Sequence, residues 1–500
     1  MTMGNQEYEY VRTVAAAAKI PFDEALARMT TARDEHGVSF REYNKLKLYR
    51  FTEKAAITQG ERLKKLDESN RRHMEAVCQA TGRTEAQIRH DLDAFNDNPY
   101  AKVDIAQYDE RQLYSEDRDA STQYLMDLHE RQTMLPRITA ILKAIDRGES
   151  TFEVLWQLLP RYYELTESTL LPSDIEDVRE SIEKSAPEIL EDEDLLRQTV
   201  VDMLVCKRTM GFWDFEYLMF DFRNKSFAER RTFVSNYDRT VILSRANDRV
   251  KSEVLDNKAL TYEIFKDFYG REAAVINGPE DESTFADFCS RHAAFVKKPL
   301  NGAMGTGIGK VTVEQGTDLH ELFTGIFEDV GPFICEELII AHPAIRQLNA
   351  DSVNTVRLST YFDGHTVHMH WPFMKIGRAG SFVDNGGAGG ILVAIDEEKG
   401  TFVSTGIDEA CTRYTQHPDN GTVFAGFQLP NWNDALELGR RIAMCALERI
   451  PDVRFIGWDI TCNDQGRWVV IEGNAFSQFI GQQAPLEIGV RTQLDKMIRA

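Results

Sequence analysis

One segment near the end of the chain restricts the possible fold most strongly: Phe455 to Gln478, read as F-I-G-W-D-I-T-C-N-D-Q-G-R-W-V-V-I-E-G-N-A-F-S-Q. Two β-favouring runs, 455–462 and 467–471, flank Asn-Asp-Gln-Gly, a composition that suits a tight turn. The pattern therefore predicts a β-hairpin. Asp459 and Glu472 fall within a residue or two of each other across this hairpin, about 5 Å apart if directly opposed.

A third polar residue follows on the same strand. Asn474 lies two residues after Glu472, and alternation along a strand puts both side chains on one face. Two carboxylates and an amide oxygen on one face suit Mg²⁺, or Mn²⁺, because such hard cations prefer oxygen ligands and accept phosphate oxygens beside them. The alternative is a solvated hairpin face on which Asn474 only ends the strand.

The two halves of the chain differ in amino-acid composition and in the pattern of apolar residues. Residues 1–245 are poor in glycine and rich in Glu, Lys, Arg, Ala and Leu, which favours a helical region. From residue 246 onward glycines cluster, β-branched runs appear, and turn dipeptides such as Asp363-Gly364 separate the runs. This half is typical of an α+β fold. We predict strands near 293–299, 308–313, 333–339, 354–362, 366–375, 389–395, 454–462 and 467–473, and helices near 256–269, 281–292, 317–328 and 431–448.

The helical half contains a weak internal repeat. The segment Gly37-Val-Ser-Phe-Arg-Glu42-Tyr43 is echoed by Gly211-Phe-Trp-Asp-Phe-Glu216-Tyr217, with glycine, glutamate and tyrosine in the same register. One interpretation is a duplicated helical module that docks a partner. The other is two similar starts of amphipathic helices.

Composition excludes several classes of protein. A net charge of −22 over 500 residues argues against a broad nucleic-acid-binding surface, although a local pocket with a metal can still bind an anion such as ATP. The seven cysteines form no C-x-x-C pair and indicate reduced thiols. The first residues lack the features of a signal peptide, and no apolar run reaches the roughly 18 residues of a spanning helix. We therefore expect a cytoplasmic protein.

A glycine-rich loop follows a lysine-ended strand in the run from Ala294 to Gly309, A-F-V-K-K-P-L-N-G-A-M-G-T-G-I-G. Such a loop lets backbone N–H groups surround phosphate oxygens while a lysine supplies charge. The spacing fits neither a P-loop nor the G-x-G-x-x-G dinucleotide motif. By itself the run also fits a plain turn.

Three further segments combine strands with charged residues: F-I-C-E-E-L-I at 333–339, S-V-N-T-V-R-L at 352–358, and M-K-I-G-R-A-G-S-F-V-D-N-G-G-A-G-G at 374–390. Each alone also fits an edge strand with solvated charges. In this order, however, and followed by Asp459 and Glu-x-Asn, they resemble the ATP-grasp superfamily, most closely its sugar-transfer-associated group. The chain is also similar to ligases that add glutamate to proteins and cofactors. The resemblance covers roughly residues 250–490.

The resemblance implies an α+β fold in which an all-helical domain (1–245) precedes a two-lobed ATP-grasp domain (lobes 246–335 and 336–500). It also implies a nucleotide site between the lobes. Lys298 would contact the α- and β-phosphates of ATP, Lys258 resembles the first nucleotide lysine, and Gly305 and Gly307 belong to the phosphate loop. The backbone of Glu336, Glu337 and Leu338 would meet the adenine edge.

The remaining implied roles concern the reaction. Asp459, Glu472 and Asn474 match the positions that bridge Mg²⁺ to the β- and γ-phosphates. Arg357, Arg378 and Asn385, with Lys375 beside them, would surround the γ-phosphate and an acyl phosphate.

The implied activity is ATP-dependent ligation of a carboxylate to an amine through an acyl phosphate, with release of ADP and phosphate. A saccharide or a peptide-like metabolite is the substrate class that we expect. The expected partners are a small-molecule carboxylate and an amine acceptor, with a homodimer or a protein partner through the helical domain. Two alternatives stay open. One is a phosphotransferase that uses the same ATP site, and the other is a non-catalytic ATP-grasp scaffold.

Overall fold

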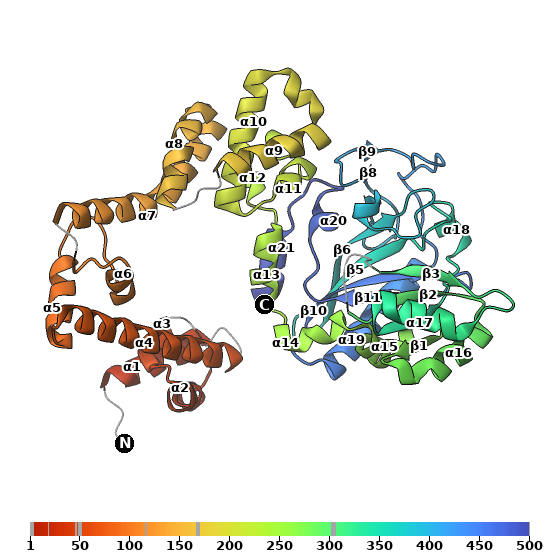
Figure 1. Cartoon of the computed structure of the whole chain (residues 1–500), viewed down its shortest axis with the longest axis horizontal. Helices are drawn as coiled ribbons and strands as arrows, with labels where there is room; N and C mark the ends of the chain where they lie inside the picture. The colour runs from red at the N-terminus through yellow and green to blue at the C-terminus, as the bar shows by residue number, and fades with distance from the viewer. Residues whose placement is uncertain are drawn as a thin grey trace. The chain divides into compact units, whose positions relative to one another are not determined.

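The computed structural model describes residues 5–18, 20–45, 48, 53–115, 118–166, 171–301 and 307–499 (Figure 1). The chain forms two compact units, Met1–Leu135 and Pro136–Ala500. This division differs from the three predicted domains, 1–245, 246–335 and 336–500. The boundaries at residues 245 and 335 stay predictions.

The first unit is helical. It contains α1 (Asn5–Ala18), α2 (Phe22–His36), α3 (Phe40–Lys45), α4 (Glu53–Thr81), α5 (Glu85–Phe95), α6 (Ile105–Glu110) and the first part of α7 (Arg118–Asp146). Its apolar side chains form two clusters, one around Met29 and Phe40 and one around Val77 and Ile88. These helices therefore form their own cores.

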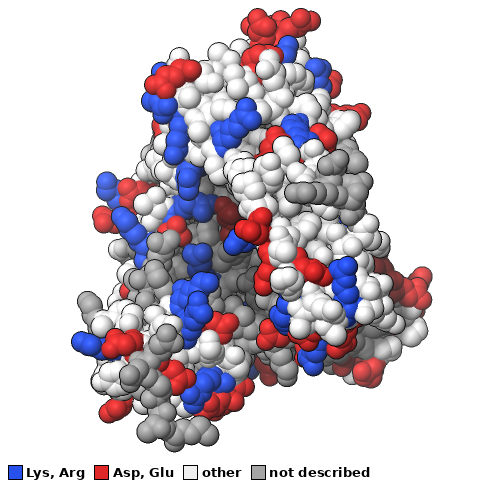
Figure 2. Space-filling model, turned by 90° about the vertical axis from the view of Figure 1, so that its left-hand side faces the viewer, with Lys and Arg blue, Asp and Glu red and all other residues white. Residues whose placement is uncertain are grey.

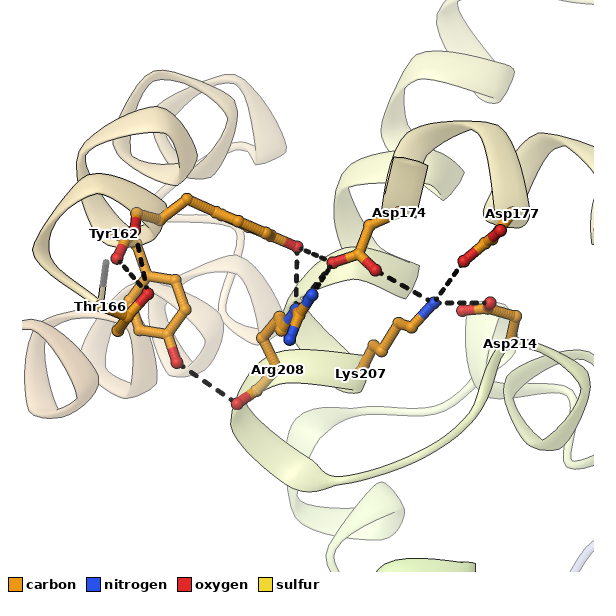
Figure 3. Close-up of polar contacts among 8 residues, drawn as sticks. Tyr162, Thr166, Asp174, Asp177, Lys207, Arg208 and Asp214 are labelled. Carbon is orange, nitrogen blue, oxygen red and sulfur yellow. Dashed lines mark hydrogen bonds and ion pairs between the residues drawn. The ribbon is translucent and has the colours of Figure 1, made fainter. Parts of the chain in front are cut away.

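The second unit begins with more helices: α8 (Phe152–Leu165), α9 (Leu171–Ser185), α10 (Glu193–Val205) with a π-helical turn η3 (Cys206–Met210), α11 (Asp214–Met219), α12 (Phe227–Arg230) and α13 (Asn236–Leu243). A buried carboxylate ties several of them together (Figure 3). Asp174 on α9 accepts hydrogen bonds from the Tyr163 hydroxyl on α8 and from Arg208 on η3, while Lys207 reaches both Asp174 and Asp214 on α11. The network fixes the helices because each polar group has a charged partner.

A four-stranded antiparallel sheet follows, with strand order β1-β4-β2-β3. Its elements are α14 (Arg249–Ser252), α15 (Lys258–Phe265), β1 (Ala273–Ile276), α16 (Glu282–Arg291), β2 (Ala294–Pro299), β3 (Gly309–Thr312), α17 (Leu319–Val330) and β4 (Phe333–Glu337). Buried phenylalanines from α16, α17 and the strands form its core, among them Phe285, Phe288, Phe295, Phe323 and Phe333.

A seven-stranded antiparallel sheet, in the order β11-β10-β5-β6-β7-β8-β9, completes the unit. Its elements are α18 (Pro343–Arg346), β5 (Thr355–Phe362), β6 (Val367–Ile376), β7 (Ile391–Ala394), β8 (Gly406–Ile407), β9 (Arg413–Tyr414), α19 (Trp432–Arg449), β10 (Phe455–Cys462), β11 (Trp468–Asn474), α20 (Ile480–Gln483) and α21 (Arg491–Arg499). Helix α19 packs on β5, β6, β10 and β11 and buries its apolar stripe there.

The prediction of an α+β chain with a helical N-terminal region is confirmed. The strands and helices predicted after residue 246 are all present, whereas β1, β8 and β9 were not predicted. On the face seen in Figure 2, acidic and basic side chains are mixed, and neither sign covers it alone. Among the helices of the described residues, none has the length and apolarity needed to span a membrane.

The two copies of the internal repeat have the same local structure. Gly37 and Gly211 each end a helix at positive φ, 70° and 73°. Five and six residues later stand a glutamate and a buried tyrosine, and the glutamate side chain, Glu42 or Glu216, accepts a hydrogen bond from the N–H three residues before it. The repeat is therefore a recurring helix–turn–helix unit. Part of the sequence after the first copy lies outside the described residues.

Candidate active site

A cavity of about 230 Å³ lies between the two sheets of the second unit. It collects side chains from η5 (Glu253–Asp256), α15, β2, β4, β6, β10 and β11 and from the loop after β6. The residues of the predicted site that line it are Lys258, Lys298, Glu336, Glu337, Leu338, Lys375, Asn385, Asp459, Glu472 and Asn474. Positions that are up to about 200 residues apart in the sequence thus share one cavity.

The predicted hairpin forms one wall of this cavity. Strands β10 and β11 pair Asp459 directly with Glu472 and Gly457 with Asn474. Gly473, between the two polar residues of β11, is required by packing, because a Cβ there would lie 2.5 Å from the Trp458 ring. The Asn474 amide donates a 3.3 Å hydrogen bond to the Glu472 carboxylate. The three candidate metal ligands therefore face the same cavity.

Asp459 is held by two cations. Its carboxylate accepts hydrogen bonds from Arg357 Nε (2.5 Å), Arg357 Nη2 (3.0 Å) and Lys375 Nζ (2.8 Å). Burial alone would raise the pKa of Asp459, but the Arg357 and Lys375 charges outweigh it and hold that pKa well below its usual range. Asp459 is therefore ionised. Arg357 does not line the cavity itself but contacts Asp459, which does.

A second group of buried charges lies at β4 of the four-stranded sheet, and its arginine also bonds to β11 of the seven-stranded sheet. Glu336 on β4 accepts hydrogen bonds from Arg271 Nη2 (2.6 Å) and Lys298 Nζ (2.8 Å). Arg271 also donates to the Val470 carbonyl on β11 at 2.6 Å. Burial opposes the charge of Glu336, yet the two cations lower its pKa to about 2. The Glu336 side chain thus orients Lys298 and joins β4 to β11.

Helix α15 and Ile308, which follows the glycine loop, also line the cavity. Asn257 caps α15 by accepting hydrogen bonds from the N–H groups of Ala259 and Leu260, which places Lys258 in the first turn at the cavity. Burial lowers the pKa of Lys258. Gly307 has φ +74° and a Cβ there would lie 2.7 Å from the Pro299 ring, so the loop needs glycine at this position. The predicted loop residue Gly305 lies outside the described residues.

The predicted arginine and asparagine of the loop after β6 are separated by the structure. Asn385 lines the cavity. Arg378 does not belong to the lining and instead forms a bidentate ion pair with Asp419, at 2.8 and 2.9 Å. An approach of Arg378 to a ligand in the cavity would require this ion pair to open.

Sequence reasoning missed several polar residues of the cavity, among them Arg271 and Asp384. Arg271 follows Tyr-Gly without any recognisable pattern, so nothing in the sequence signals its pairing with Glu336. Asp384 directly precedes the predicted Asn385 and could have been found from that position. Its carboxylate accepts hydrogen bonds from the N–H (2.8 Å) and the hydroxyl (2.6 Å) of Thr355, which fastens the loop to β5.

The donor set fits a divalent cation only together with an anionic ligand. No cluster of three or more His, Cys, Asp and Glu side chains suited to a metal occurs in the described part of the chain. The hairpin of β10 and β11 instead offers two carboxylates and one amide to a cavity that Lys258, Lys298 and Lys375 also line. Phosphate oxygens would complete the coordination of Mg²⁺ and meet the lysines, so the residues fit a metal–nucleotide complex.

Two sheets that enclose a lysine-lined cavity, with Asp, Glu and Asn on one hairpin, are the arrangement that the motif order led us to expect of an ATP-grasp protein. The model of the sugar-transfer associated ATP-grasp family matches residues 238–498, and the chain belongs to this family. The predicted membership of the ATP-grasp superfamily and of its sugar-transfer-associated group is therefore confirmed.

Three ligases are among the solved structures that are similar to this chain. The ATP-grasp ligase PsnB complexed with minimal precursor is 15% identical, with 51% of this chain and 63% of that chain covered and a TM-score of 0.31. The D-alanyl-alanine synthetase A from Vibrio cholerae O1 biovar eltor str. N16961 is 15% identical over 49% and 61%, with a TM-score of 0.31. The VanG D-Ala:D-Ser ligase from Enterococcus faecalis is 14% identical over 50% and 63%, with a TM-score of 0.33.

The chain thus spans less than two thirds of the length of each of these structures. No curated protein matches the chain significantly.

Proposed function

We propose that this protein is an ATP-dependent ligase that joins a carboxylate to an amine through an acyl phosphate and releases ADP and phosphate. The observation that carries the proposal is the cavity in which three lysines face Asp459, Glu472 and Asn474. Membership of an ATP-grasp family supports the nucleotide.

The nucleotide would lie between the sheets. Lys298, oriented by Glu336, and Lys258 would contact the phosphates, and Gly305 and Gly307 would let the loop backbone approach them. The backbone of Glu337 and Leu338 would meet the adenine edge. Because the Glu336 carboxylate is hydrogen-bonded to Arg271 and Lys298, its side chain would affect the nucleotide by orienting Lys298.

Asp459, Glu472 and Asn474 would hold Mg²⁺, which when bound neutralises charge on the β- and γ-phosphates. Lys375 and Arg357 keep Asp459 ionised and fixed in position. Their remaining positive charge would oppose the charge that builds up on the transferred group.

The reaction would proceed in two steps. A carboxylate oxygen of the substrate attacks the γ-phosphorus, the bond to the bridging oxygen of the β-phosphate breaks, and ADP leaves. The amine then attacks the acyl carbon and loses a proton, and phosphate departs with the electron pair of the C–O bond. Asn385 and Lys375 line the cavity where the acyl phosphate would form, and Arg378 would join them on leaving Asp419.

The test is nucleotide turnover with Mg²⁺ or Mn²⁺ against pooled carboxylates and amines, followed by mass analysis of the products. A ligase should release ADP and form an acyl hydroxamate when hydroxylamine replaces the amine. AMP as the product would overturn the acyl-phosphate route. ADP together with a stable phosphorylated compound would establish a phosphotransferase instead.

A further inference from the structure

The end of the candidate metal-binding strand is held from outside the ATP-grasp sheets by Asn247, a buried residue just after α13. Its side-chain amide donates 2.7 Å hydrogen bonds to the carbonyls of Phe455 and Ala475. Its oxygen accepts from the N–H groups of Arg454 and Phe455. Asn247 therefore joins the beginning of β10 to the residue that follows Asn474.

Arg239, on α13, reaches the next residue. Its Nη1 donates to the carbonyl of Phe476, and its Nε donates to the carbonyl of Asn236 on the same helix. Arg239 is partly buried, and this burial lowers the pKa of its guanidinium. The two residues after Asn474 are thus both hydrogen-bonded to the helical region before residue 250.

Glu216, the glutamate of the second repeat copy, fixes the start of α13. One carboxylate oxygen accepts a 2.8 Å hydrogen bond from the Asn236 N–H, and the other accepts from the Trp213 N–H at 2.9 Å. The side chain is buried, and burial raises its pKa to about 7. Burying a carboxyl group costs free energy unless its oxygens are hydrogen-bonded, and these two N–H groups provide the hydrogen bonds.

We propose that the second repeat copy positions the metal-binding end of β11, through a chain of contacts from Glu216 to α13, from Arg239 to Phe476, and from Asn247 to Ala475. This inference rests on the proposed function, since it takes Asn474 as a metal ligand. Glu216, Arg239 and Asn247 are positioning residues that touch neither nucleotide nor metal. The helical segment that holds Glu216, Arg239 and Asn247 would then set the geometry of the active site without lining it.

The first repeat copy provides a matched control. Glu42 makes the same local contact, accepting hydrogen bonds from the N–H and the hydroxyl of Ser39. It belongs to the first compact unit and not to the one that holds the cavity. Glu42→Gln and Glu216→Gln therefore change the same contact to the N–H three residues earlier, at a partly exposed site in the first copy and a buried site in the second, and only Glu216 contacts α13.

The experiment uses the full chain and two titrations, of ADP without metal and of Mn²⁺ into the ADP complex, the latter followed by electron paramagnetic resonance. Glu216→Gln and Arg239→Met should each weaken Mn²⁺ binding tenfold or more, as expected for groups that orient metal ligands. Affinity for metal-free ADP should change less than twofold. Arg239→Lys should recover part of the loss, and Glu42→Gln should match the wild type.

Several outcomes would overturn the inference. One is unchanged Mn²⁺ affinity in folded Arg239→Met or Glu216→Gln protein. Another is an equal loss of metal-free ADP binding, which would indicate general damage to the fold. If Arg239→Met does not fold, Glu216→Gln decides, because it keeps one acceptor oxygen and the size of the side chain. Failure of the wild type to bind Mn²⁺ with ADP would refute the proposed function itself, a result distinct from these.

Discussion

At the scale of single residues, charge pairing decides what the cavity can do. Among the described residues, Glu336 is the only carboxylate that contacts both Arg271 and Lys298, so Glu336→Gln leaves two buried cations without this counter-ion. We expect a loss of about 3–5 kcal/mol in the free energy of unfolding, measured by urea denaturation. Glu337→Gln, at the next and partly exposed position, is the control and should cost far less.

The same pair predicts a pH dependence. The pKa of Glu336 is lowered to about 2 in the folded protein, below the value near 4.3 of an unfolded glutamate. Its contribution to stability is therefore complete above about pH 4.3 and is lost as the pH falls toward 2. The stability gap between wild type and Glu336→Gln should narrow over that interval. A gap that stays constant from pH 6 to pH 3 would contradict the assigned ion pair.

Glu472 tests the metal site. Glu472→Gln removes one negative oxygen from the hairpin while keeping its shape, so metal-supported ATP turnover should fall below detection and the melting temperature should stay near that of the wild type. The exposed Glu398→Gln is the control. Normal turnover in Glu472→Gln would show that the hairpin carboxylates are structural.

At the scale of elements, the glycine loop after β2 is the most sensitive part of the nucleotide site. Gly307→Val should weaken ADP binding at least tenfold in calorimetry, because the backbone is left-handed there and the new side chain meets the Pro299 ring. Gly316→Val is the matched control, since Gly316 also has positive φ (+90°) but has no atom within 4 Å of an added Cβ. Equal effects of the two changes would assign the loss to backbone strain alone.

At the scale of the whole molecule, the compact units predict how the chain can be shortened. Residues 136–500 form one unit and should fold and bind ADP with the affinity of the full chain. A chain that starts at Ala246 loses Val234 and Leu243 from a cluster with Phe479 and Leu494, and it loses the hydrogen bonds between Val234 and Gln483. We expect this shorter chain to aggregate in size-exclusion chromatography. A monomeric, active 246–500 fragment would contradict both this prediction and the positioning role of Arg239.

The sequence by itself determined the elements whose signals are local. The hairpin of 455–462 and 467–471 is predictable because its β-favouring runs and its turn residues lie within a few positions of one another. Asn463 does close that turn by accepting hydrogen bonds from the N–H groups of Gln465 and Arg467. The motif order likewise led to the family. The pairing of Asp459 with Glu472 followed from the same short-range register.

Only the tertiary structure decided which charges meet. Arg271 and Glu336 are 65 residues apart, Asp459 and Arg357 are 102 apart, and Arg378 turns to Asp419 rather than to the cavity. Which residues pair at such separations depends on how the sheets pack. The sequence pattern of a strand does not distinguish a solvated charged side chain from one that is buried against an opposite charge. The short strands β8 and β9 were missed for the same reason, since two residues carry no periodicity and are strands only because β7 lies beside β8 and β8 beside β9.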